Sequence, residues 1–271
     1  VTNMSAMFWH FGMGALQELN LGNNFDTSNV TDMSEMFNSA GHAIKSLSLG
    51  EKFNTSKVTD MHNMFNATGY DAMTSLNLGD KFDTSNVTNM NSMFSQTGYK
   101  LLKVLDLGDK FDTSNVTDMG FMFSWTGVES LNSINLGDKF DTSKVTNMSY
   151  MFCNTGWGNL TKLDLGDKFA TSNVTSMKYM FLGTGYKTLK TLNLGDKFDT
   201  SNVTNMENMF GSIGVNTLTS LDLGNKFNTS KVTNMKGMFN WTGNGSMTSL
   251  NLGPAFTKIA ETNTDLFNGV G

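Results

Sequence analysis

The chain has 271 residues with 24 acidic and 19 basic side chains, a formal charge of -5, and 38% hydrophobic content. Because no basic stripe is present to neutralise phosphates, nucleic acid is not expected as a partner. No run approaches the roughly 18 consecutive apolar residues that a membrane-spanning helix needs, so none is expected.

A segment resembling Phe-Asp-Thr-Ser recurs nine times from Phe25 onward, with a spacing of 28 residues once and 29 thereafter. A period of roughly 20–50 residues indicates a solenoid, in which each unit buries its apolar side chains against its neighbours. Val1–Phe8 aligns with Val30–Phe37, so the chain is expected to begin in the middle of a coil. We predict a single solenoid domain over residues 1–260, with about nine 29-residue coils.

Each coil contains two apolar segments. The first reads Leu-x-x-Leu-x-Leu-Gly, as in 189–195, and predicts a short strand closed by a turn. The second reads Val-x-x-Met-x-x-Met-Phe, as in 203–210, and its spacing of three predicts a strand start that passes into a helical or 3-10 turn. Eight apolar side chains per coil are expected to point inward, and many of them are Met or Phe.

At the C-terminal end the Val-Thr-x-Met pattern dissolves, although Leu266-Phe267 still echoes the Met-Phe pair. A solenoid needs a cap over its last apolar layer, so residues 261–271 are predicted to form a C-terminal cap. The predicted fold is therefore a mainly β solenoid with short helical or 3-10 turns.

Catalysis needs unlike residues in unique positions, such as a nucleophile beside a base. The three His residues, at 10, 42 and 62, share no position in the coil, and Cys153 has no His nearby in sequence. The sequence predicts no enzyme, no catalytic residue and no cofactor.

Acidic residues fall in two columns, where stacking would set like charges about 5 Å apart. A Lys column between them could relieve the repulsion, whereas calcium would need roughly six to eight converging oxygen ligands. Since Asn54, Ala170 and Asn228 interrupt one column, no metal site is predicted. The columns are Asp80, Asp109, Asp138, Asp167 and Asp196; and Asp26, Asp83, Asp112, Asp141 and Asp199.

The repeated Thr27-Ser28-Asn29 motif is expected to close a turn and to join coils through hydrogen bonds from side chain to backbone. An ice-binding surface built from a regular Thr column is the alternative.

Binding specificity is expected at the variable positions, because the other positions of each coil are committed to packing. Aromatic side chains gather there, beside the recurring Thr-Gly pair. They could stack on sugars or anchor a protein partner, or they could fold back over the end of the apolar layer. The predicted ligand-binding residues are Tyr70, Tyr99, Trp125, Trp157, Tyr186 and Trp241.

The string Phe-Asp-Thr-Ser-Asn-Val-Thr-Asp-Met at 25–33 and 111–119, with the Leu-x-x-Leu-x-Leu and Met-Phe segments, resembles the BspA-like leucine-rich-repeat surface proteins of bacteria. The resemblance implies a right-handed leucine-rich-repeat-like solenoid, exported and displayed on the bacterial cell surface. It also implies adhesion to host extracellular matrix protein, mucin or another glycan, or other cells. The coils here are longer than that family's usual pattern, and no cell-wall sorting motif or lipid-attachment Cys is present.

Two functions follow from these observations. The first is an extracellular adhesion domain that binds its partners weakly per coil and strongly when many chains engage together. The alternative is a structural spacer that binds nothing, or a self-associating surface stalk.

Overall fold

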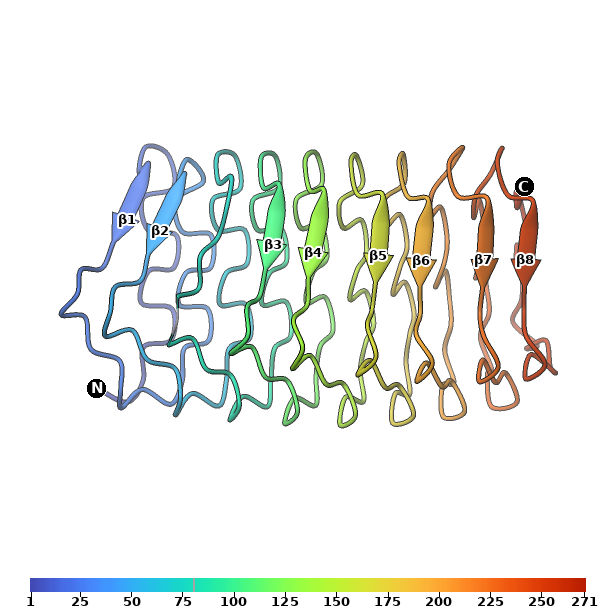
Figure 1. Cartoon of the computed structure of the whole chain (residues 1–271), viewed down its shortest axis with the longest axis horizontal. Coiled ribbons are helices and arrows are strands. Elements are labelled where there is room, and N and C mark those ends of the chain that lie inside the picture. Colours follow the sequence, from blue (N-terminus) through green and yellow to red (C-terminus); the bar gives the residue numbers. More distant parts are fainter. Residues whose placement is uncertain (80) are drawn as a thin grey trace.

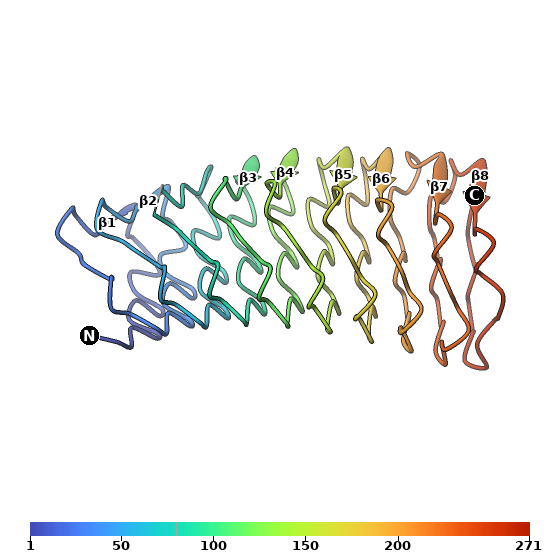
Figure 2. The ribbon, with the colours of Figure 1, turned by 60° about the horizontal axis from the view of Figure 1, so that its bottom comes forward.

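The structure is a computed structural model that describes residues 1–79 and 81–271, so Asp80 of the acidic column lies outside the described residues. The chain forms a β-solenoid of about eight coils of about 29 residues, stacked side by side (Figures 1 and 2). The predicted mainly β solenoid is confirmed, whereas its right-handed winding and the count of nine coils stay predictions. The strands are β1 (Glu18–Asn20), β2 (Ser46–Ser48), β3 (Val104–Asp106), β4 (Ser133–Asn135), β5 (Lys162–Asp164), β6 (Thr191–Asn193), β7 (Ser220–Asp222) and β8 (Ser249–Asn251).

The middle residue is buried in β2, β3, β5, β6 and β7 and partly buried in β1, β4 and β8, while the two residues beside it are exposed, as expected of alternating side chains on a half-buried strand. In the coil that contains β3, eight apolar side chains point inward and are at most 4% exposed. Each such layer packs against the layers of the neighbouring coils, so that the core runs the length of the molecule. The eight are Leu102, Leu105, Leu107, Phe111, Val116, Met119, Met122 and Phe123.

The Met-x-x-Met-Phe segment does not form the predicted helical or 3-10 turn, and no described residue is helical. The Met122 N–H donates to the Met119 carbonyl at 3.2 Å and closes a β-turn, while the next N–H donates to Met151 of the following coil at 2.8 Å. Phe121 and Trp125, with φ of 58° and 59°, take the third position of successive turns, where type II turns require positive φ. Consecutive turns share the three-residue spacing of a helix, which explains the wrong prediction.

Rows of stacked rings measure the spacing between coils. The row that follows the Gly turns, from Phe25 to Phe256, has ring centroids 6.2–6.5 Å apart. The row in the Met-Phe pairs, from Phe8 to Phe267, has centroids 5.2–5.8 Å apart. Surface aromatic pairs such as Tyr70–Tyr99 lie only 4.4–4.8 Å apart. The coils are therefore wedge-shaped and the solenoid is curved, with these surface rings on its shorter side.

The strands pair two by two, as β1–β2, β3–β4, β5–β6 and β7–β8, all in parallel. On the opposite face an unbroken series of single bridges runs from Asn3 to Thr262. Within each of the last three pairs, an Asn amide donates to the Asp carboxylate of the preceding strand at 3.1 Å, for example Asn193 to Asp164. A single bridge, from Ser75 to Val104, also joins the Ser75 coil to β3. At the breaks between β4 and β5 and between β6 and β7 an Asp follows an Asn, and its carboxylate has no N–H to donate to the preceding strand.

Candidate functional site

The recurring Thr-Gly pair positions a column of rings, here called the aromatic edge, formed by Tyr70, Tyr99, Trp157 and Tyr186. Tyr70 and Tyr99 stack with centroids 4.6 Å apart and planes 13° apart, and His42 lies at 5.4 Å from Tyr70 on its other side. All of these side chains are half-buried, because each ring covers part of its neighbour. Burial raises the pKa of the Tyr70 phenol, so it stays a protonated donor at neutral pH.

The aromatic edge is interrupted rather than continuous. Val128 holds the next position after Tyr99 and is buried, which leaves Trp157 and Tyr186 as a separate pair 4.8 Å apart. The Lys187 ammonium lies 4.2 Å from the centroid of a Trp157 ring, within cation–π range.

The two remaining predicted residues lie outside this column. Trp125 is 41% exposed and its ring centroid lies 6.3 Å from that of Tyr99, so it joins the first stack. Trp241 is 47% exposed and stands apart from the other predicted residues, near Gly269.

Sequence reasoning missed a second row of surface rings, here called the Phe-Tyr ladder, formed by Phe121, Tyr150 and Tyr179. Their centroids lie 4.4 and 4.6 Å apart, with planes within 8°. They occupy the second variable position of Met-x-x-Met, which looked like part of the packing frame. The signal was present in sequence, since the other coils have small or polar residues at that position.

Charged groups border the Phe-Tyr ladder. The Tyr179 hydroxyl donates to a carboxylate oxygen of Glu207 at 3.0 Å, and the Lys178 ammonium lies 5.7 Å from the centroid of Tyr150. Burial raises the pKa of both Tyr150 and Tyr179, and for Tyr179 the hydrogen bond to Glu207 raises it further. The two phenols therefore stay protonated and can donate at neutral pH.

The acidic column that follows Phe in each coil closes turns. The carboxylate of Asp112 accepts the Ser114 N–H at 2.9 Å, and Asp26 accepts the Ser28 N–H in the same way. Burial raises the pKa of Asp112, but the hydrogen bonds from Ser114 outweigh it and hold the pKa below its usual value. Among the described residues, no group of three or more His, Cys, Asp or Glu side chains could hold a metal ion.

The Thr column that begins at Thr27 joins coils from within, as the turn-closing interpretation predicts. Thr113 is fully buried, and its hydroxyl donates to the Asp141 carbonyl of the next coil at 2.8 Å. A buried hydroxyl cannot order surface water, so the ice-binding alternative is wrong for this column. A different Thr column is exposed, as at Thr117, and each hydroxyl there donates to the preceding coil.

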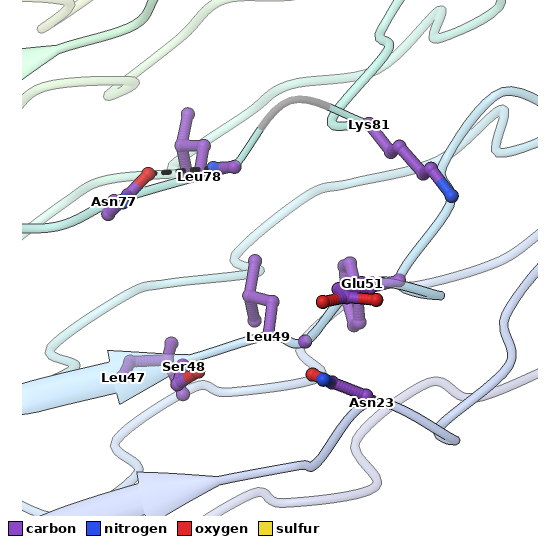
Figure 3. A pocket seen from close by; sticks show the side chains of 11 residues that line it. Asn23, Leu47, Ser48, Leu49, Glu51, Asn77, Leu78 and Lys81 are labelled. Atoms are coloured by element: carbon purple, nitrogen blue, oxygen red, sulfur yellow. Dashed lines mark hydrogen bonds between the residues drawn. The ribbon is translucent and has the colours of Figure 1, made fainter.

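Grooves open on the strand face where the sheet is broken. The groove between β2 and the Ser75 coil has a volume of about 610 Å³, and another of about 610 Å³ lies between β4 and β5. Both have leucine or isoleucine floors and polar rims; Figure 3 shows Leu47, Leu49 and Leu78 of the first groove with Glu51 and Lys81. None of the predicted aromatic residues lines these grooves.

The model of the family described as "Mycoplasma protein of unknown function, DUF285" matches the chain three times, over residues 2–99, 69–185 and 158–251. Together these overlapping matches span nearly the whole solenoid. The chain belongs to the DUF285 family. Each match spans more than three of the 29-residue coils, so the family model corresponds to a run of coils.

No curated protein matches this DUF285 chain. Among solved structures it is similar to the one titled "Crystal structure of TLR13-ssRNA13 complex", with 21% sequence identity and a TM-score of 0.33. That match covers 94% of this chain and 35% of the other, so the DUF285 chain spans about a third of the length of that protein.

Cys153 and His62 of the DUF285 chain lie outside both rows of surface rings. Burial raises the pKa of the Cys153 thiol to about 12, so it is not a thiolate at neutral pH. His62 lies between two carboxylates, 2.8 Å from Asp60 and 3.7 Å from Glu35, on the surface. No helix that could span a membrane occurs in the described part of the chain.

Proposed function

We propose that this solenoid is an adhesion domain, exported to the bacterial cell surface, that binds a protein of the host matrix or of another cell. The observation that carries the proposal is the concentration of surface rings on the shorter side of the curve. Solenoids use their concave surfaces for binding, and Tyr and Trp supply much of the energy at protein interfaces. The resemblance to BspA-like proteins supports the surface location and the adhesive role.

Ring geometry favours a protein over a sugar as the partner. A sugar stacks on the face of an aromatic ring, but at spacings of 4.4–4.8 Å the rings of each stack cover one another's faces. Their edges and hydroxyls remain available, and these suit the side chains and carbonyls of a protein. Mucin stays in the test because its protein core also offers such groups.

The test compares binding of the purified chain to immobilised fibronectin and mucin with that of a variant in which Tyr70, Tyr99, Trp157 and Tyr186 are replaced by Ser. We expect the variant to lose most of the binding. Val104→Ser is the matched control, because Val104 is 45% exposed on the strand face and Ser occupies the same place in neighbouring coils. Equal binding by the fourfold variant and the control would place the site elsewhere.

A non-binding spacer or self-associating stalk is the second candidate. It is supported by the unbroken series of bridges from Asn3 to Thr262, which ties every coil to the next. A spacer is expected to bind neither fibronectin nor mucin, and a stalk is expected to show concentration-dependent association in sedimentation.

A further inference from the structure

The Phe-Tyr ladder occupies positions that do not favour large side chains. Phe121, Tyr150 and Tyr179 have φ of 58°, 60° and 59°, in the left-handed region, where Cβ crowds the backbone. Asn and Gly adopt this region readily, and the same column holds Asn63 and Asn208 in other coils. The fold therefore accepts small polar residues here, and the aromatic side chains are confined to three consecutive coils.

Stacking of these rings leaves a narrow strip of ring edges on the surface. Phe121 is 38% exposed, and the planes of the three rings lie within 8° of their neighbours. The edge of an aromatic ring carries partial positive charge, and the Tyr150 and Tyr179 phenols add donors. The strip thus offers positive edges and O–H groups but hardly any open ring face.

Two ammonium groups stand over aromatic rings of the segment that precedes β5, Lys178 over Tyr150 and Lys187 over Trp157, at 5.7 and 4.2 Å from the ring centroids. The lysine ion pairs within 4.0 Å among the described residues are Lys100–Asp71 and Lys162–Asp164, so no described carboxylate lies within 4.0 Å of either of these two ammonium groups. The coil that contains both lysines also contributes Tyr179 and Tyr186, each next to one of the lysines in sequence. Positive charge therefore accompanies the donors of the strip.

Within the chain, one hydroxyl of the ladder already binds a carboxylate. Glu207 of the following coil places its carboxylate 3.0 Å from the Tyr179 hydroxyl, which donates to it. The hydroxyl of Tyr150, one coil earlier, has no such carboxylate among its described hydrogen-bond partners. Because the Glu207 carboxylate would repel another acidic group, a carboxylate of a partner is expected at the Tyr150 hydroxyl and not at that of Tyr179.

We propose that the Phe-Tyr ladder, with Lys178 and Lys187, is a docking surface for an acidic segment of a protein partner. This inference rests on the proposed adhesive function and names the chemistry of the partner. Carboxylates of the segment accept from the Tyr150 hydroxyl and pair with the two ammonium groups, while its aliphatic groups contact the ring edges.

The experiment measures fluorescence anisotropy of a labelled poly-L-glutamate peptide of about twenty residues at low and physiological salt. We expect the wild-type chain to bind the peptide with an affinity that falls as salt is added. The variant Phe121→Ser/Tyr150→Asn/Tyr179→Asn and the variant Lys178→Gln/Lys187→Gln should each weaken binding by roughly tenfold or more. Val104→Ser is again the matched control and should bind like the wild type.

Folding of the ladder variant is secured by its design, because Ser and Asn are the residues that this column holds in other coils. Its urea midpoint should equal or exceed that of the wild type, whereas a purely structural role for the rings predicts a clear fall in the midpoint. Absence of poly-L-glutamate binding by the wild type would overturn the proposal, as would equal binding by the ladder variant.

Heparin separates an acidic protein from an anionic glycan. Tighter, ladder-dependent binding of heparin than of poly-L-glutamate would assign the surface to a glycan and overturn the proposal. Fibronectin or mucin binding that survives the ladder variant would leave adhesion standing and remove this site from it. If the chain binds the peptide through the ladder but binds neither fibronectin nor mucin, the acidic docking surface stands and the proposed adhesion to these ligands is wrong.

Discussion

Alternating strand pairs predict that equivalent glycines respond differently to the same substitution. Gly137 and Gly166 lie two residues after the ends of β4 and β5, with the same φ of 75°. A Cβ added at Gly137 would lie 2.9 Å from the carbonyl oxygen of Gly108, because its coil is paired with the preceding one. A Cβ at Gly166 would meet nothing within 4 Å, because the sheet is broken there.

The magnitudes follow from these surroundings. An Ala in the left-handed region costs about 1–2 kcal/mol, partly offset by the lower entropy of the unfolded chain, so Gly166→Ala should lose about 1 kcal/mol. Gly137→Ala adds a contact with a backbone atom that cannot rotate away, and overpacking of this kind costs about 1–3 kcal/mol more.

Urea unfolding, followed by circular dichroism, measures both variants against the wild type at constant m-value. We expect the midpoint of Gly137→Ala to fall clearly below that of Gly166→Ala. Equal losses would mean that the two interfaces are equally close, and would refute the alternation of paired and open interfaces.

Three further predictions concern single side chains. Thr126→Val removes a buried hydroxyl that donates to the preceding coil at 2.7 Å and should cost about 1 kcal/mol in urea unfolding; the exposed Thr117→Val should change stability by less than about 0.5 kcal/mol, and equal losses would contradict the burial argument. The Cys153 thiol should react with a disulfide reagent at pH 8 only after unfolding, and since its pKa rises from 9.0 to about 12 on folding, stability relative to Cys153→Ser should fall as the pH rises from 9.0 to about 12; rapid labelling of the folded chain would count against this. Asp164→Asn supplies an amide donor at the break between β4 and β5, so hydrogen exchange at the Leu136 amide should slow, and unchanged exchange would show that the side chains do not set the break.

The solenoid and its core could be predicted because one ring of apolar side chains is repeated in every coil. Any fold of such a chain must bury that ring coil after coil, so the period alone determined the architecture. The turn geometry could not be derived from the Met spacing, which suits a helix and consecutive β-turns equally. Residues that tolerate positive φ, such as Asn63, Asn208 and Gly237, were the clue to the turns.

The candidate site was predicted less completely. Neighbouring aromatic residues in the Thr-Gly column were expected to lie together, and Tyr70 and Tyr99 do so. At the next position the column is interrupted, because the small apolar side chain of Val128 is buried and does not stack on the surface. The Phe-Tyr ladder was missed because its position lies between two core Met residues. The alternation of Asp and Asn at the strand ends, as at Asp164 and Asn193, also contained a signal for the pairing of strands. That signal can be interpreted only once the Asn amide is known to donate to the Asp carboxylate of the preceding strand.

The two-by-two pairing also has a mechanical consequence. Strand pairing adds backbone contacts within each pair that the interfaces between β4 and β5 and between β6 and β7 lack. Those two interfaces are held by the apolar core, by Thr hydroxyls and by the bridges on the opposite face. A load along the solenoid is therefore expected to separate the coils first at these two interfaces.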